Sequence, residues 1–313
     1  MSYTNTDAPV QFSLEEVADG VFGYIQPDGT WMINNTGFIV ARDGVSAIDA
    51  SSTERRTRAF RDAIGSVTRG PVRTLVNTHH HPDHTAGNGV FADATIVAHE
   101  LARDEMRTLG LPHNSGVWTD ADYGDLKLTL PFLTFADRLT LWADDLRCEL
   151  LFAGGPAHTT NDIVVWIPER SVLFSGDLLF NGGTPFQLSG SVLGAIDVLE
   201  NFLRPLGAQT IVPGHGPVGG PELIEPVLGY LRFIADLAAE GRAAGVAPLE
   251  LARGTDLGQY AELSDPERIV GNLHRAYADL AGPAEARGGP INFTAALTDM
   301  IAYNGGRPLT CRA

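Results

Sequence analysis

The chain has 313 residues, 44% of them hydrophobic, and a formal net charge of −16 at pH 7. This length and apolar share are enough for one large α/β domain, or two smaller ones, with a buried core. The negative charge argues against binding nucleic acid or an anionic membrane through a broad positive field. Two cysteines are too few for a disulfide scaffold.

The N-terminal segment, residues 1–12, is polar and lacks the basic start and apolar stretch of a secretion signal. No apolar run elsewhere approaches the length needed to span a bilayer. We therefore expect a soluble, cytoplasmic protein without a membrane partner. The sequence leaves the oligomeric state open.

The first half of the chain predicts alternating strands and helices. Strands are expected at residues 21–25, 37–41, 45–49, 73–77 and 95–98, the first of them joined by tight turns such as Pro27-Asp28-Gly29. The segment Ser51-Ser52-Thr53-Glu54 has the pattern of a capping box, which predicts a helix after it. A second helix is expected over residues 100–109.

Residues 110–125 show neither the helical nor the strand period, so they predict a long loop that carries His113, Trp118 and Tyr123. Long ordered loops in compact domains often cover a functional site. The alternative is a solvent loop that its aromatic side chains merely hold down. No role is assigned to His113, nor to His274 further along, and a structural role is favoured for both.

The second half repeats the pattern of strands followed by helices. Strands are expected at residues 138–142, 146–152, 162–167, 171–174 and 210–212. Helices are expected at residues 192–203, from 221 onward and at 265–280. Two strand-rich halves, each ending in helix, predict an α/β protein built as a four-layer αββα sandwich. Residues 1–220 would form the core, and residues 221–313 a helical C-terminal extension packed on the same domain.

One short stretch concentrates potential metal ligands. The spacing H-x-H-x-D-H places four of them within six residues: His79, His81, Asp83 and His84. The stretch follows an expected strand, and Pro82 prevents it from continuing as one. Imidazoles beside a carboxylate suit zinc or iron at a hydrated, catalytic centre. A surface cluster without a role is the alternative, and it would lack partners downstream.

Three more ligand-type side chains each follow an expected strand: His158, Asp177 and His215. Each alone is a weak indication, because a single histidine in a glycine-rich loop is often structural. The carboxyl ends of strands are, however, the edge where open α/β sheets bind ligands. The shared placement of all these residues therefore favours one metal centre.

These motifs resemble the metallo-β-lactamase superfamily over about residues 15–220. The resemblance implies the αββα fold and two metal ions, most simply two zinc ions, with iron or manganese as alternatives. The first ion would be held by His79, His81 and His158. The second would be held by Asp83, His84 and His215, with Asp177 bridging both. Asp49 matches the acidic residue that supports the histidine loop from behind the ligands.

The chain departs from the motifs of several branches of the superfamily, and each departure argues against the activity of that branch. Antibiotic-destroying members usually carry a secretion signal and have Cys or Ser where this chain has Asp177. Glyoxalase II members follow their last histidine ligand with Glu-Tyr-Thr, whereas Gly216-Pro217-Val218 stands here. RNA-processing members need a positive surface, which the charge opposes.

Within the superfamily, the chain resembles second-ring cyclase/thioesterases of aromatic polyketide biosynthesis. The similarity lies in GTWMINN at residues 29–35, GVW at 116–118, TPF at 184–186 and NLHRA at 272–276. It implies hydrolysis of a thioester or activated ester, or ring closure, on a small molecule or an acyl carrier, with Asp83 orienting the nucleophile in hydrolysis.

The sequence gives a less specific indication of which residues form the walls of a substrate pocket. Five apolar side chains are candidates, each equally compatible with ordinary core packing: Trp31, Met32, Trp118, Phe180 and Phe186. A lactonase or another small-molecule metallo-hydrolase is the alternative function. A mononuclear iron oxygenase and a non-catalytic binding module are opposed by the complete second set of ligands.

Overall fold

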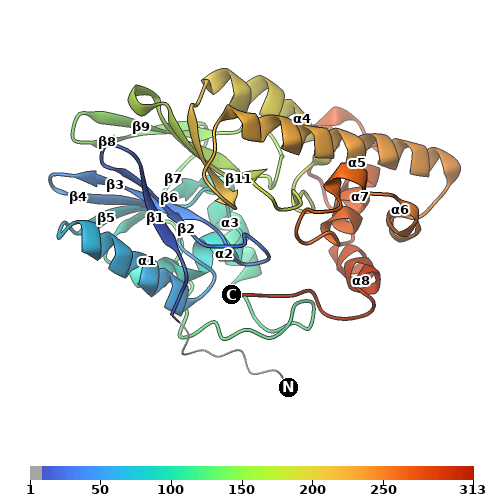
Figure 1. Ribbon diagram of the computed structural model, residues 1–313, viewed down its shortest axis with the longest axis horizontal. Helices are drawn as coiled ribbons and strands as arrows, with labels where there is room; N and C mark the ends of the chain where they lie inside the picture. Colours follow the sequence, from blue (N-terminus) through green and yellow to red (C-terminus); the bar gives the residue numbers. More distant parts are fainter. Residues whose placement is uncertain (1–8) are drawn as a thin grey trace.

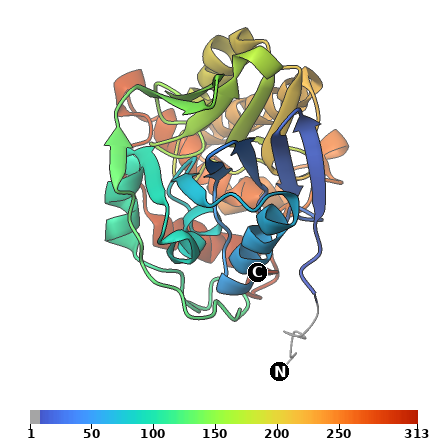
Figure 2. The same ribbon diagram turned by 90° about the vertical axis from the view of Figure 1, so that its left-hand side faces the viewer.

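The computed structural model describes residues 9–313; residues 1–8 of the polar N-terminal segment lie outside the described residues. Two β-sheets stack face to face, and helices cover the outer face of each (Figures 1 and 2). The strand order is β1-β2-β3-β4-β5-β6-β7 in one sheet and β12-β11-β10-β9-β8 in the other. The four-layer αββα sandwich expected from the sequence is therefore confirmed.

The first sheet is antiparallel from β1 to β4 and parallel from β4 to β7. Its strands are β1 (Ser13–Ala18), β2 (Val21–Ile25), β3 (Thr36–Ala41), β4 (Gly44–Ile48), β5 (Val72–Val76), β6 (Thr95–His99) and β7 (Leu133–Phe135). The helices of this half are α1 (Glu54–Val67), α2 (Pro82–Thr85) and α3 (Glu100–Leu109). Phe60, Ala63 and Ile64 of α1 pack on the outer face of the sheet.

The second sheet is antiparallel except for the parallel pair of β11 and β12. Its strands are β8 (Arg138–Ala143), β9 (Leu146–Phe152), β10 (Ile163–Ile167), β11 (Val172–Phe180) and β12 (Thr210–His215). The helices α4 (Val192–Val198) and α5 (Ile224–Ala244) cover it, and α6 (Pro248–Gly254), α7 (Arg268–Asp279) and α8 (Phe293–Tyr303) pack against these helices and one another. One apolar cluster runs from β11 into α7 and α8, so the C-terminal helices pack on the same core.

A second apolar cluster fills the space between the two sheets and joins residues such as Ile39 and Val76 to Val165 and Phe174. The sheets approach each other closely at Gly37, where a Cβ atom would lie 2.2 Å from Cε1 of Phe174. A side chain at residue 37 would therefore push the layers apart.

Two local predictions in the first half were wrong. Residues 26–35, not a tight turn, connect β2 to β3, although the two strands do pair antiparallel. The cap of α1 is Thr53, whose hydroxyl accepts from the backbone N–H of Arg56 at 3.2 Å. Ser51 instead lies between Gln26 and Thr57, because its hydroxyl accepts from the Gln26 amide and its backbone N–H donates to Thr57 Oγ1.

The remaining differences concern short or edge elements. β1, β7 and α6 were not predicted, since each is too short or too exposed to show a clear period. α8 was missed as well. β11 extends to Phe180 and β12 to His215, beyond the predicted ends at residues 174 and 212.

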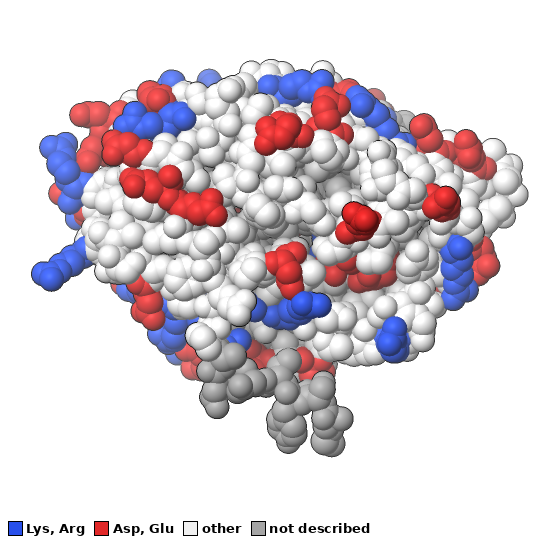
Figure 3. All heavy atoms as spheres, viewed as in Figure 1, with Lys and Arg blue, Asp and Glu red and all other residues white. Residues whose placement is uncertain are grey.

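The face shown in Figure 3 is mostly uncharged and carries small, separate acidic and basic patches, with acidic ones also near its centre. In the part of the chain that is described, no helix is long and apolar enough to cross a membrane.

Candidate metal centre

The histidine loop leaves the first sheet at the end of β5. Pro82 opens α2, a position that requires no N–H donor, and places Asp83 and His84 in one short turn. Behind the loop, the side-chain amide of Asn77 donates to the carbonyl of His84 at 3.1 Å and pairs with the amide of Asn88. The loop is thus tied to the strand that precedes it.

The second sheet supplies the other three expected ligands. His158 lies between β9 and β10, as predicted, but Asp177 lies within β11 and His215 is the last residue of β12. The pairing of β11 with β12 shifts register around Gly176, which allows the strand to aim Asp177 at the site. A Cβ atom on Gly214 would lie 1.9 Å from Oδ1 of Asp177, so only glycine leaves room for that carboxylate.

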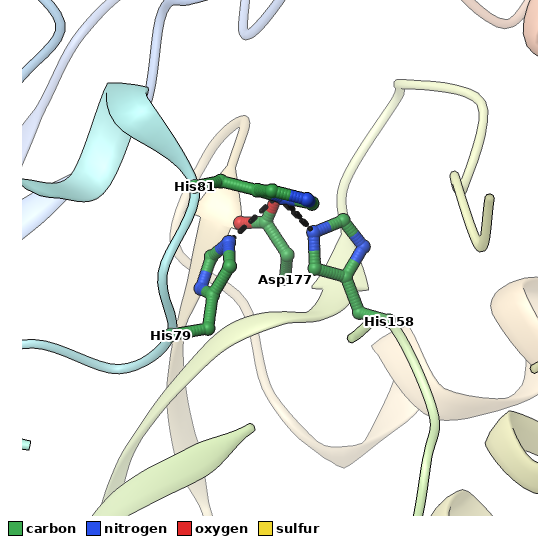
Figure 4. A group of neighbouring side chains, drawn as sticks. All are labelled: His79, His81, His158 and Asp177. Atoms are coloured by element: carbon green, nitrogen blue, oxygen red, sulfur yellow. Dashed lines mark hydrogen bonds and ion pairs between the residues drawn. The ribbon is translucent and has the colours of Figure 1, made fainter. Parts of the chain in front are cut away.

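All seven expected ligands meet at this edge in two groups, and within each group the ligand atoms lie within 4.8 Å of one another. The first group is His79, His81, His158 and Asp177, and the second is Asp83, His84, Asp177 and His215. Figure 4 shows the three imidazoles of the first group around the Asp177 carboxylate. Oδ2 of Asp177 lies 3.3 Å from Nε2 of His158, and Oδ1 lies 3.1 Å from Nε2 of His84. Asp177 is therefore the side chain shared by both groups.

Four of the histidine rings have one nitrogen held by the protein on the side away from the centre. The contacts are His79 Nδ1 to Thr78 Oγ1 at 3.0 Å, His84 Nδ1 to Asp49 Oδ2 at 2.8 Å, His158 Nδ1 to the Phe186 carbonyl at 2.5 Å and His81 Nε2 to Ser189 Oγ at 3.1 Å. Such outer partners fix the orientation and tautomer of metal-binding histidines. The other nitrogen of each ring is left to face the centre.

Asp49 supports this arrangement from behind, where the resemblance placed it. Its Oδ1 accepts from the backbone N–H of Thr78, and its Oδ2 accepts from the Thr78 hydroxyl, both at 2.7 Å. The same Oδ2 also contacts Nδ1 of His84. Asp49 adopts a left-handed φ of 58°, a conformation that aspartate tolerates better than most residues.

The polar atoms at the centre fit divalent cations. Nε2 of His79, Nε2 of His84 and Oδ1 of Asp177 are buried without a hydrogen-bond partner among residues 9–313. Native proteins rarely leave such atoms unsatisfied, and ions held by the two ligand groups would account for all three. Nitrogen and carboxylate donors of this kind suit zinc.

The electrostatics of the cluster agree with this fit. Burial lowers the pKa of His79 well below its ordinary value. Burial acts in the same direction on His215, but Asp177 and Asp83 outweigh it and raise its pKa to about 9. The buried carboxylates are thus stabilised by positive charge close to them. A bound cation would supply this charge while the histidines stay neutral.

A cavity of about 410 Å³ opens directly over the ligands. It is lined by all five side chains that the sequence offered as pocket walls: Trp31, Met32, Trp118, Phe180 and Phe186. The Trp31 ring meets Trp118 and Phe186 edge-on, with centroids 5.5 and 5.0 Å apart, and Phe180 stacks on His215 at 5.1 Å. The long loop from Gly110 onward also lines this cavity.

The two unassigned histidines differ in position. His113 lies on the cavity wall, whereas Nε2 of His274 lies 2.8 Å from Oδ2 of Asp299 and ties α7 to α8. Sequence reasoning missed Ser189 and Arg268, which also line the cavity. Neither stands in a motif, and an arginine on an amphipathic helix usually indicates a solvated face.

An αββα sandwich that gathers five histidines and two aspartates at one sheet edge is the architecture of metal-dependent hydrolases. A family model described as the metallo-beta-lactamase superfamily matches residues 29–215, and the chain belongs to this superfamily.

Known proteins of several activities are similar to the chain. A metallo-beta-lactamase type 2 of Bacteroides fragilis is 26% identical over 223 residues, which cover 68% of this chain and 82% of that protein. A hydroxyacylglutathione hydrolase of Rhodospirillum rubrum is 32% identical over 141 residues, 44% of this chain and 45% of that protein. The solved structure of a metallo-beta-lactamase from Pontibacter korlensis is 21% identical, with a TM-score of 0.60 over 71% of this chain and 99% of its own. This last likeness shows the fold alone.

Proposed function

We propose that the protein is a dinuclear zinc hydrolase that cleaves a thioester or activated ester with a flat, apolar acyl group. The observation that carries this proposal is the convergence of all seven ligand-type side chains beside an aromatic-walled cavity, which five of them line: His81, Asp83, His158, Asp177 and His215. The relative named as a hydroxyacylglutathione hydrolase supports an acyl substrate. An aromatic polyketide intermediate, free or on an acyl carrier, is the specific substrate that we propose.

The proposed chemistry divides between the ions and the side chains. Two divalent cations, held as described above, would supply an acidic bound water and polarise the substrate carbonyl. Asp83 both lines the cavity and belongs to the second ligand group, with Oδ2 3.3 Å from Nε2 of His215. This position supports a role for its carboxylate in orienting the nucleophile and accepting its proton.

The cavity walls support an aromatic substrate. Flat apolar walls favour flat acyl groups through burial and ring contacts. Among the described residues that line the cavity, Arg268 is the one arginine or lysine, and its side chain is only 2% exposed. A small anionic substrate would find little accessible positive charge on these walls.

The direct test is a substrate panel with the zinc-reconstituted protein. We expect hydrolysis of naphthoyl and benzoyl thioesters with kcat/KM of about 10⁴ M⁻¹s⁻¹ or more. Trp118→Ala should raise KM for the aryl thioesters far more than for an acetyl thioester, because Trp118 forms part of the wall. Equal effects on both would exclude this pocket, and hydrolysis confined to lactones would replace the proposal by a lactonase.

A further inference from the structure

We infer that Glu267 and Arg268, at the start of α7, hold the Trp31 ring in the cavity wall and thereby set the preference for large, flat acyl groups. The two residues lie beyond the segment that matches the superfamily. The substrate part of this inference rests on the proposed function, whereas the part about the wall does not.

Two contacts fix the Trp31 ring from the side of the C-terminal extension. Its indole Nε1 donates to Oε1 of Glu267 at 2.6 Å. The guanidinium carbon of Arg268 lies 4.1 Å from the centre of the ring. All three residues are buried, so both contacts are shielded from water and strengthened by the low dielectric.

Arg268 is itself anchored. One guanidinium nitrogen donates to the carbonyl of Thr184, and another forms an ion pair with Oδ2 of Asp265, both at 2.9 Å. Its guanidinium also lies 5.4 Å from the centre of the Phe180 ring. The anchored Arg268 guanidinium therefore contacts two aromatic rings of the cavity wall, those of Trp31 and Phe180.

Trp31 needs this support because it lies in the irregular connection between β2 and β3. Its ring is the common partner of Trp118 and Phe186, so a shift of Trp31 disturbs the whole aromatic wall. Without Glu267 the indole N–H would be buried without an acceptor, which favours movement of the ring out of the wall.

In the described part of the chain, Glu267 and Arg268 form no hydrogen bond or ion pair with the seven metal-ligand candidates. They act through Trp31 and are positioning residues. Their loss should weaken the binding of aryl groups while leaving the metal content and the turnover of small substrates intact.

The experiment compares Glu267→Ala and Arg268→Met with Glu267→Gln and with a matched control, Asp279→Asn. The Gln side chain still accepts the indole N–H. Asp279 is buried on the same helix and accepts from Ser191 and Leu193, so the control alters a buried carboxylate that lies outside the cavity lining. The Kd for 2-naphthamide, which is measured by the quenching of tryptophan fluorescence, reports how well the aromatic wall binds an aryl group that the enzyme does not hydrolyse.

We expect Glu267→Ala and Arg268→Met each to raise the Kd for 2-naphthamide and the KM for a naphthoyl thioester about tenfold, the effect of one lost buried contact. The acetyl thioester KM and the zinc content should stay unchanged, and Glu267→Gln and Asp279→Asn should resemble the wild type. An unchanged Kd, or equal changes for acetyl and naphthoyl substrates, would overturn the inference. If the wild type hydrolyses no thioester, the proposed function fails, and the binding measurement still decides the role of these residues. If the Arg268→Met protein does not fold, the comparison of Glu267→Ala with Glu267→Gln tests the inference by itself.

Discussion

Asp177 belongs to both ligand groups of the candidate metal centre. Its Oδ1 lies 3.1 Å from Nε2 of His84, and its Oδ2 lies 3.3 Å from Nε2 of both His158 and His215, so the carboxylate contacts histidines of both ligand groups. The backbone around it is adapted to this task, because Gly176 shifts the strand register and Gly214 leaves space for the carboxylate.

Asp177→Asn should therefore reduce the bound zinc from two equivalents to at most one and lower hydrolytic activity by about 100-fold or more. An amide cannot supply the negative charge that two cations share. Elemental analysis and steady-state kinetics measure both effects. Asp93→Asn, which only breaks an exposed ion pair with Arg61, is the control. Two zinc equivalents with full activity in the Asp177→Asn protein would contradict the bridging role.

Asp49→Asn should weaken zinc binding about 10- to 100-fold without changing the cavity. The carboxylate accepts from the Thr78 backbone, the Thr78 hydroxyl and His84, and an amide presents one oxygen where two are needed. Competition with a chelating dye measures the affinity. Wild-type affinity in this variant would show that the histidine loop keeps its shape without Asp49.

The bounds of helices and strands were predicted correctly where the hydrophobic period of the sequence agrees with the packing of the element. The bounds of β2, β9 and α3 match the sequence prediction, since each carries a clear period and ends at a turn. The convergence of the seven ligand candidates could be predicted, because four of them lie within six residues and the other three lie at or near the ends of apolar strands. The contribution of α7 to the cavity was not, because it arises from contacts with a loop more than 200 positions away.

The loop that carries Trp118 is held by the C-terminal segment. Leu309 donates its N–H to the carbonyl of Val117 and accepts from the N–H of Thr119, both at 2.8 Å. Figures 1 and 2 show the C-terminus close to this loop.

Leu309→Pro should remove the first of these bonds, loosen residues 110–132 and raise KM for aryl thioesters. Limited proteolysis should then cut this loop several times faster than in the wild type. Thr310→Pro, at the exposed neighbouring position, serves as the control. Equal cleavage rates in all three proteins would show that the loop is held by other contacts.

For the whole molecule, membership of the superfamily does not fix the substrate. We expect kcat/KM below about 10⁴ M⁻¹s⁻¹ for penicillins and carbapenems. The position shared by the two ligand groups holds Asp177, not the Cys or Ser of the antibiotic-destroying pattern, and aromatic side chains form part of the cavity wall. Spectrophotometric assays at saturating zinc measure this, and efficient turnover would place the protein with the lactamases.

Removal of the ions should destabilise the fold. A ligand present at 100 times its Kd stabilises the native state by about 2.7 kcal/mol. For a chain of this size the loss should lower Tm by about 5 °C when a chelator is added. The Asp177→Asn protein should respond less, and an unchanged Tm in the wild type would speak against a tightly bound metal.

The hydrogen bond between Trp31 and Glu267 joins residues 236 positions apart, and that between Asp28 and Arg312 joins residues 284 apart. The ligand candidates, by contrast, all lie between residues 79 and 215. Closing the longer loops costs more entropy. All the ligand candidates are also synthesised before α7, which begins at Arg268. On the inference made above for Glu267 and Arg268, the contacts that orient the aromatic wall become possible only after those that bring the ligand candidates together.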